Sequence, residues 1–196
     1  MDLELTDNVA LVTASSSGLG KASGRALASE GANVVLNGRN QDRLDAAVEE
    51  VREAAADTAS VIGHAGDLTD PDDIADLVER PVAEFGGLDH LILSAGGPPS
   101  KPFLETTDEE WYEAFDLLVM SAVRTVRAAE PHLTESEHGT VVNITSASVK
   151  EAIDGLVLSN AVRMSVIGLE KTISKELAPD IRANAVLPGT HETPRI

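Results

Sequence analysis

The sequence predicts a parallel β-sheet covered by helices on both faces. Short runs of apolar, mostly β-branched residues alternate along the chain with longer segments of helical pattern, which is the order of repeated β-α-β units. The predicted strands are almost continuously apolar, as expected where both faces of a sheet are buried. With 196 residues, 42% of them apolar, the chain can build one sizeable core. No repeat or long linker indicates a second domain, so we assign residues 1–196 to one domain.

Each predicted element follows from its local pattern. Strands are expected at Val9–Val12, Asn33–Leu36, Ser60–His64, Leu88–Leu93, Thr140–Ile144 and Ala183–Leu187. Helices are expected at about Lys21–Ser29, Gln41–Ala55, Pro71–Phe85, Asp108–Leu133 and Leu156–Leu177. Asp70 before Pro71 resembles an N-cap followed by proline at the first helical position, and Thr107 with Glu110 fits a capping box. The expected fold is a doubly wound, Rossmann-like α/β sheet.

The composition excludes several classes of protein. The absence of cysteine excludes a disulfide framework and a thiolate metal site, and we predict no metal site. No apolar stretch approaches the roughly eighteen residues of a membrane span, and the N-terminus lacks the basic start of a signal peptide. We therefore expect a cytoplasmic protein that does not bind membranes.

The charge is strongly acidic. Thirty-three acidic residues against fifteen basic ones give a net charge of -18, which argues against nucleic acid as a partner because phosphate binding needs a basic face. The acidic residues are spread over many helices, a pattern that suits a surface in high salt, where screening suppresses self-repulsion. We hypothesise a halophilic source, and greater stability at low than at molar salt would contradict it.

The most informative segment follows the first predicted strand. It consists of eight small or flexible residues that lead into a helix: Thr13, Ala14, Ser15, Ser16, Ser17, Gly18, Leu19 and Gly20. A buried strand, a tight turn and a helix present backbone N–H groups and the positive end of the helix dipole to a phosphate. The turn therefore predicts a dinucleotide-binding site.

The other strand ends support this prediction, because ligands of such a sheet bind outside the carboxyl ends of its strands. Small or polar residues follow the remaining five strands, at Asn37–Asn40, Gly66–Leu68, Ser94–Gly97, Thr145–Ser148 and Pro188–Thr190. Six such ends are a stronger signal than any single motif.

Together these residues give the chain a resemblance to the short-chain dehydrogenase/reductase family over essentially its whole length. The matching landmarks are Thr13–Gly20, Asp67-Leu68, Ala95-Gly96, Asn143–Ser146 and the segment from Asn184 to Pro188-Gly189. Around Gly96–Pro99 and Leu158–Asn160 the chain is similar to a divergent branch of the 3-oxoacyl-[acyl-carrier-protein] reductases. The resemblance implies NAD(P)(H) binding and interconversion of a carbonyl and an alcohol in a small-molecule substrate.

The resemblance also implies roles for particular residues. The cofactor would be held by Thr13, Ser15, Ser16, Ser17, Gly18, Leu19, Gly20, Arg39, Asp67, Leu68, Ala95, Gly96, Arg163, Pro188 and Gly189. A homodimer or homotetramer is implied as well, because the helix of Trp111, Tyr112 and Phe115 commonly packs against a partner's in this family. We interpret these aromatic residues as core or subunit contacts.

The implied catalytic set is altered. Ser146 matches the family's active-site serine, but Leu118 stands at the position of the asparagine that organises a proton-relay water. Ser159 replaces the catalytic tyrosine, and Arg163 its partner lysine. An aliphatic hydroxyl is a far weaker acid than a phenol, whereas an arginine can hold the nicotinamide ribose and stabilise an oxyanion. Ser146, Ser159 and Arg163 are thus the catalytic candidates.

The second strand's end bears on cofactor choice. The segment Leu36–Asn40 contains no acid and one arginine, Arg39, which favours NADP over NAD. Alternatively, Arg39 is a surface residue paired with Asp42 or Asp45. Asp67 resembles the family's adenine-contacting acid, with helix capping as its alternative role.

Other residues could donate the proton that carbonyl reduction requires. Lys150 could act as an acid if it is desolvated beside the nicotinamide pocket, or it could be a solvated lysine paired with Glu151. His191 and Glu192 could face the cleft or simply be exposed.

Three functions remain open at this point. They are an NADP(H)-dependent oxidoreductase, a dinucleotide-binding sensor or partner subunit with little or no turnover, and an apo structural subunit. Family members usually continue past the Pro-Gly-Thr segment with a lid, a helix and a seventh strand. We therefore expect either a chain truncated before the last helix and strand or a protein that lacks part of its substrate pocket.

Overall fold

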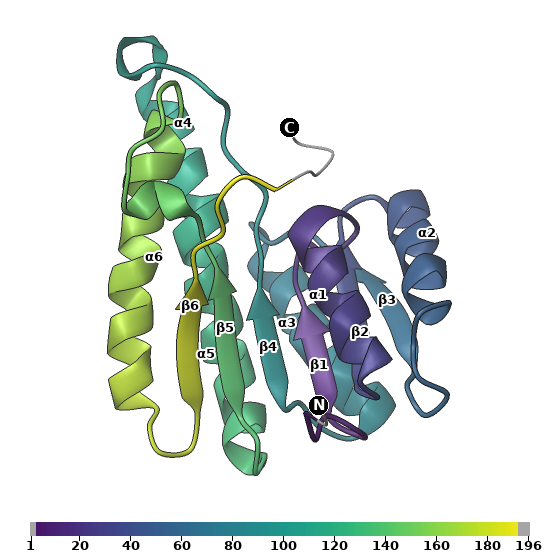
Figure 1. Cartoon of the computed structure of the whole chain (residues 1–196). Helices are drawn as coiled ribbons and strands as arrows, with labels where there is room; N and C mark the ends of the chain where they lie inside the picture. Colours follow the sequence, from purple (N-terminus) through teal and green to yellow (C-terminus); the bar gives the residue numbers. More distant parts are fainter. Residues whose placement is uncertain (1–2, 192–196) are drawn as a thin grey trace.

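Six parallel strands form one sheet at the centre of the protein, with helices on both of its faces (Figure 1). The structure is a computed structural model and describes residues 3–191. The strands are β1 (Val9–Val12), β2 (Asn33–Gly38), β3 (Val61–Ala65), β4 (His90–Leu93), β5 (Thr140–Ile144) and β6 (Arg182–Val186). Their order across the sheet is β3-β2-β1-β4-β5-β6. The order reverses next to β1, which confirms the doubly wound α/β fold.

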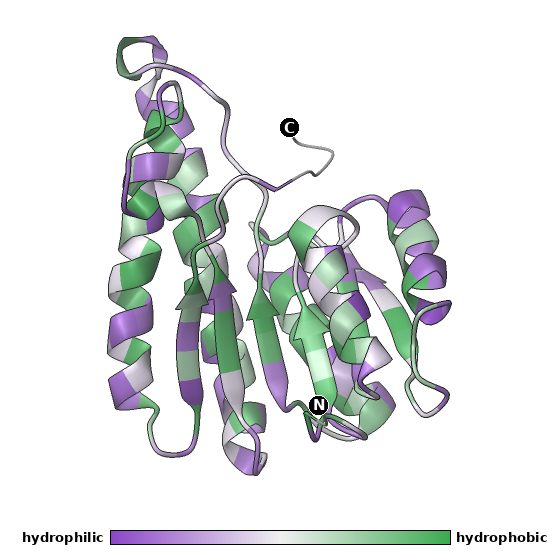
Figure 2. Ribbon diagram, viewed as in Figure 1, coloured by the Kyte–Doolittle hydropathy of each residue, from purple (hydrophilic) through white to green (hydrophobic). Residues whose placement is uncertain are grey.

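The helices divide between the two faces of the sheet. They are α1 (Gly18–Ser29), α2 (Gln41–Arg52), α3 (Pro71–Phe85), α4 (Asp108–Phe115), α5 (Ser121–Glu135) and α6 (Val157–Glu176). Helices α1 and α2 cover one face over β1 to β3, whereas α3, α5 and α6 cover the other (Figure 1). The strands are mostly hydrophobic apart from hydrophilic residues in β6, whereas the helices carry both hydrophilic and hydrophobic residues (Figure 2).

Both predicted helix starts are confirmed. The Asp70 carboxylate accepts a hydrogen bond from the Asp72 N–H at 2.8 Å, and Pro71 is the first residue of α3. Thr107 and Glu110 form the reciprocal capping box at the start of α4.

The expected single helix over Asp108–Leu133 is interrupted. A π-helical turn, η2 (Asp116–Met120), separates α4 from α5. No residue in this stretch marks such a turn in the sequence, but π-helical turns are often found at functional sites. The other elements differ from the prediction only at their ends, by up to three residues.

The core lies on both sides of the sheet, and a third cluster packs α6 against α4 and η2. Within residues 3–191, no helix is both long and apolar enough to cross a membrane.

Candidate functional site

A cleft of about 750 Å³ opens at the carboxyl ends of the strands. Most of the residues predicted from the sequence lie in its wall. These are Ser16, Ser17, Gly18, Leu19, Gly20, Arg39, Asp67, Leu68, Ala95, Gly96, Ser146, Ser159, Arg163, Pro188 and Gly189. The fold thus brings together residues that are far apart in the chain.

The turn after β1 leaves backbone donors open to this cleft. Ser17 is the N-cap of α1, but its side chain makes no capping hydrogen bond, and the first turn of α1 contains no acidic residue. The N–H groups and dipole of α1 can therefore act on an anion. A Cβ on Gly20 would lie 2.8 Å from the Ala14 carbonyl oxygen, so the helix approaches the turn this closely only with glycine there.

Thr13 and Ser15 do not line the main cleft, and their predicted cofactor contact stays a prediction. The Thr13 hydroxyl donates to the Ser94 carbonyl at 2.7 Å and accepts from the Ser94 N–H at 2.9 Å. The Ser15 hydroxyl donates to the Val12 carbonyl at 2.6 Å. Both side chains are buried, and their hydrogen bonds hold the shape of the turn.

Asn37, at the end of β2, is a supporting residue that the sequence analysis missed. Its side-chain oxygen accepts from the Ala14 N–H at 3.1 Å, and its amide nitrogen donates to the His64 and Gly66 carbonyls at 3.3 and 3.2 Å. It therefore joins the first turn to the end of β3. An asparagine in an otherwise apolar buried strand is the signal that could have revealed it.

Arg39 and Asp67 meet across the end of the cleft nearest β2 and β3. The Arg39 guanidinium lies 3.5 Å from the Asp67 carboxylate, so Arg39 does not pair with Asp42 or Asp45. Burial alone would raise the pKa of Asp67, but the Thr69 N–H and hydroxyl hydrogen bonds and the Arg39 charge outweigh it and lower the pKa. Asp67 does not cap α3, because Asp70 has that role.

Arg163 organises the opposite end of the cleft. Arg163 is only 8% exposed, and its Nε donates to the Ser159 hydroxyl at 3.2 Å across one turn of α6. Its two terminal nitrogens donate to the Thr145 and Gly96 carbonyls, each at 3.4 Å. Arg163 thereby connects α6 to the segments that follow β4 and β5.

Ser146 and Leu118 complete this end. Ser146 lies in the cleft wall, and its hydroxyl accepts from the Ser148 N–H at 3.1 Å. Leu118 is buried in η2. A leucine there offers no hydrogen bond to a water or a substrate.

Comparison with known proteins identifies the family. The short chain dehydrogenase family matches residues 8–195. The chain belongs to the short-chain dehydrogenases. It is 34% identical over 190 residues to the uncharacterized oxidoreductase YvrD of Bacillus subtilis, a match that covers 96% of this chain and 70% of YvrD.

Two further similarities extend this result. The human mitochondrial dehydrogenase/reductase SDR family member 2 is 32% identical over 191 residues, covering 96% of this chain and 67% of that protein. The structure of L-sorbose reductase from Gluconobacter frateurii, complexed with NADPH and L-sorbose, is 32% identical. It has a TM-score of 0.94 and covers 100% of this chain and 74% of the reductase.

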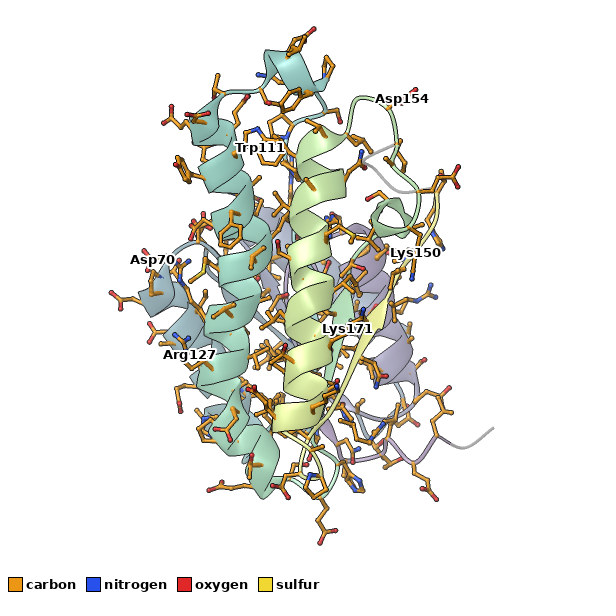
Figure 3. The ribbon with its side chains drawn as sticks, turned by 90° about the vertical axis from the view of Figure 1, so that its left-hand side faces the viewer. Asp70, Trp111, Arg127, Lys150, Asp154 and Lys171 are labelled. Carbon is orange, nitrogen blue, oxygen red and sulfur yellow. The ribbon has the colours of Figure 1, made fainter. Side chains whose placement is uncertain are left out.

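Lys150 and His191, two of the residues weighed as alternative proton donors, have different positions in this dehydrogenase. Lys150 is exposed at the end of a short 3-10 turn (Ala147–Val149; Figure 3), outside the cleft wall. Within residues 3–191 it forms no ion pair with Glu151. His191 does line the cleft, and its Nδ1 lies 3.0 Å from the Gly189 carbonyl. Glu192 lies outside the described residues.

The aromatic residues of α4 are less buried than expected for a core. Tyr112 is 75% exposed and Phe115 43% exposed, whereas Trp111 is half-buried and donates from Nε1 to the Thr106 hydroxyl at 3.0 Å. Of the two predicted roles, core or subunit contact, the core position is excluded for Tyr112 and Phe115, and the subunit contact stays a prediction. Tyr112 lies outside the cleft wall, as expected for a tyrosine with no catalytic role.

Proposed function

We propose that this short-chain dehydrogenase is an NADP(H)-dependent oxidoreductase that interconverts a carbonyl and an alcohol in a small-molecule substrate. The observation that carries the proposal is one continuous cleft, which joins the open N-terminus of α1 to the Ser146, Ser159 and Arg163 side chains. The first end suits a phosphate, and the second suits an oxygen that becomes negatively charged.

The residues present fit a nicotinamide dinucleotide. The close approach of Gly20 to Ala14 shapes the turn for a phosphate. Three arginines in the described wall, Arg39, Arg43 and Arg163, outnumber the one acid, Asp67. In a chain with a net charge of -18, this local excess of positive charge would concentrate an anionic ligand at the cleft. When bound, the nicotinamide supplies the hydride for carbonyl reduction.

NADP is preferred to NAD in this proposal. The end of β2 presents Arg39, with Arg43 following in α2, and no acid occupies the segment Asn37–Asn40. Arginine donors suit the additional phosphate, whereas a carboxylate would bind the ribose hydroxyls of NAD. The structural neighbours include both an NADPH complex of L-sorbose reductase and an NAD+-bound xylitol dehydrogenase that is 25% identical.

Arg163 is proposed as the group that stabilises charge. Its guanidinium is fixed by the Thr145 and Gly96 carbonyls and can donate to a developing alkoxide without giving up a proton. Ser159 and Ser146 offer hydroxyl groups that orient the substrate oxygen. The chain would thus belong to a divergent branch that resembles the 3-oxoacyl-[acyl-carrier-protein] reductases but has an altered catalytic set, and its proton donor is not yet assigned.

The same proposal includes a homodimer or homotetramer in the cytoplasm. Several large apolar side chains are exposed on or near α4 and α6: Phe103, Leu104, Tyr112, Phe115 and Met164. Such a group of exposed apolar residues is typical of a protein–protein contact. Sedimentation of the purified protein, which would give one, two or four copies, tests this part.

A second function is favoured by a specific observation. Leu118, Ser159 and Arg163 provide neither a phenol nor an amine at the reactive end, so the protein could bind the dinucleotide with little or no turnover. An apo structural subunit is the third alternative, in which the turn after β1 has only an architectural role.

Two measurements separate these functions. Titration with NADPH and NADH distinguishes both binding functions from the apo subunit. A turnover screen with both cofactors over a panel of ketones, aldehydes and acyl thioesters then distinguishes the enzyme from the binder. Turnover with NADPH supports the proposal, whereas tight binding without turnover on any compound supports the second function.

A further inference from the structure

One face of α6 carries polar groups from the cleft into the core. Ser159 and Arg163 lie at the cleft end, and Glu170 lies seven residues beyond Arg163, about 10 Å further along the helix axis. Glu170 is only 4% exposed. The next residue, Lys171, lies on the outer side of the helix (Figure 3). Glu170 is therefore a buried acid on the same helix as the proposed catalytic residues, and the proposed function gives it no role.

The Glu170 carboxyl has an unusual environment. Neither of its oxygens makes a hydrogen bond, and the amide nitrogen of the buried Asn143 is also without a partner. Burial raises the pKa of Glu170 to about 7, and the nearby Asn143 side chain lowers it only in part. Asn143 is thus the polar group that faces the carboxyl, although the two do not form a well-aligned hydrogen bond.

Asn143 also borders a small cavity below the cleft. The cavity has a volume of about 10 Å³, close to the minimum that one water molecule requires. Its polar wall includes Thr13, Ser121, Thr125, Thr145 and Arg163. Asn143 therefore connects the Glu170 carboxyl to a space that the Arg163 side chain shares.

Charged groups on the neighbouring elements do not account for this environment. Within the described residues, no charged side chain contributes to the shifted pKa of Glu170. Strand β5 and the turn Ala147–Val149 carry no charged residue. On the other elements packed against α6, the charged residues are Asp108, Glu109, Glu110 and Glu113 on α4, Asp116 in η2, and Arg182 on β6. Helix α5, which shares an apolar cluster with α6, carries the titratable residues Arg124, Arg127, Glu130, His132 and Glu135.

The chemistry of an amide then couples the two sites. A neutral carboxylic acid can donate its proton to the Asn143 oxygen, whereas a carboxylate can only accept from the Asn143 nitrogen. The proton on Glu170 thus selects which end of the amide faces the acid and which end faces the cavity. Because a guanidinium can only donate, the oxygen end suits a cavity bordered by Arg163 and the nitrogen end does not.

We propose that Glu170 is a positioning residue, whose proton sets the orientation of the Asn143 amide and, through the cavity, the hydrogen bonds of Arg163. When Glu170 is ionised, Asn143 presents its oxygen to the cavity and supports Arg163. When Glu170 is protonated, the amide turns and this support is lost. The consequence for catalysis rests on the proposed function, but the coupling between the three side chains does not.

The test follows the Arg163 side chain directly, in the protein without cofactor. The Nε–H signal of Arg163 is assigned by its loss in Arg163→Lys and is recorded by NMR from pH 5.5 to 8.5. We expect it to shift with a midpoint at pH about 7 and to lose this shift in Glu170→Gln. Glu176→Gln, an exposed change on the same helix, should leave the shift unchanged. An Arg163 signal that does not move, or that moves equally in Glu170→Gln, overturns the proposal.

A second measurement needs no variant. The carboxyl carbon signal of Glu170 in the parent protein should titrate with the same midpoint as the Arg163 signal, whereas titration in the ordinary range of a glutamate overturns the proposal. If a substrate is found, the pH profile of kcat should lose its step near neutrality in Glu170→Gln with little change in KM. Failure to find any turnover would count against the proposed function alone, because both NMR measurements are made without it.

Discussion

The half of the cleft over β1 to β3 and the half over β4 to β6 depend on different kinds of interaction. In the first half, backbone geometry makes the site: the open N–H groups of α1, the close approach of Gly20 and the hydrogen bonds of Asn37. In the second half, the site depends on which side chains are present. Under the proposed function, Leu118, Ser159 and Arg163 would change its chemistry, while the fold around them is preserved. We therefore expect cofactor binding to tolerate changes of side chain better than catalysis does.

In the second half, introducing the tyrosine and lysine that the family resemblance implies should have the largest effect, a rise in kcat. In Ser159→Tyr/Arg163→Lys, a phenol beside an amine could donate a proton, and general acid catalysis typically contributes ~100-fold or more. We expect kcat on the panel compounds to rise by about this factor, measured by NADPH oxidation. Ser165→Tyr, an exposed change on α6, is the control. A double variant no faster than the parent would mean that the side chains at positions 159 and 163 do not limit kcat.

The second half should also respond to pH through Glu170. Its folded pKa of about 7 exceeds the ordinary value of 4.5, so the folded state holds a proton that the unfolded state has lost between these values. Stability from this group is thus fully present below pH 4.5 and is lost as the pH rises through about 7. Glu170→Gln removes this loss, and its free energy of unfolding relative to the parent should rise by roughly 2–3 kcal/mol from pH 5 to 8.

Denaturant unfolding of both proteins at each pH gives this difference. Burial of His90 at the start of the central strand β4 lowers its pKa, so its stabilising contribution is lost as the pH falls below the ordinary pKa of histidine. This effect has the opposite sign, but it is common to both proteins and cancels in their difference. A difference that does not change with pH would mean that Glu170 is ionised normally.

In the first half, one added methyl group should weaken cofactor binding. The Cβ of Gly20→Ala would lie 2.8 Å from the Ala14 carbonyl oxygen, which forces the turn and α1 apart. We expect NADPH affinity to fall about 10-fold in a fluorescence titration, equivalent to ~1.4 kcal/mol. Gly87→Ala meets no atom within 4 Å and should bind as the parent does. Equal affinity in both variants would show that the turn does not hold the phosphates.

The smallest effect is expected from a single exposed charge in the first half. Arg39 is 74% exposed and paired with Asp67, so its contribution is reduced by solvent screening. Arg39→Ala should lower the preference for NADPH over NADH by roughly five-fold, or about 1 kcal/mol, in paired titrations. Arg80→Ala, which removes a surface pair with Glu84 on α3, should not. An unchanged preference would leave Arg43 as the phosphate ligand.

Prediction from sequence succeeded where the signal is local. Alternation of apolar and helical segments predicted all six strands, and cap residues predicted the starts of α3 and α4. It failed where a residue's role depends on distant partners. The role of Asn37 and the partner of Arg39 depend on groups that are far away in the chain. The η2 turn depends on packing between helices.

The sequence by itself determined the parallel α/β sheet and the glycine-containing turn after β1, because these follow from local pattern and motif. Only the tertiary structure decided that Thr13 and Ser15 support the turn, that Arg163 connects the segments after β4 and β5, and that Glu170 faces Asn143. Burial and hydrogen-bond partners arise when separate segments pack together, and they set both the charge of a group and the atoms that it can reach.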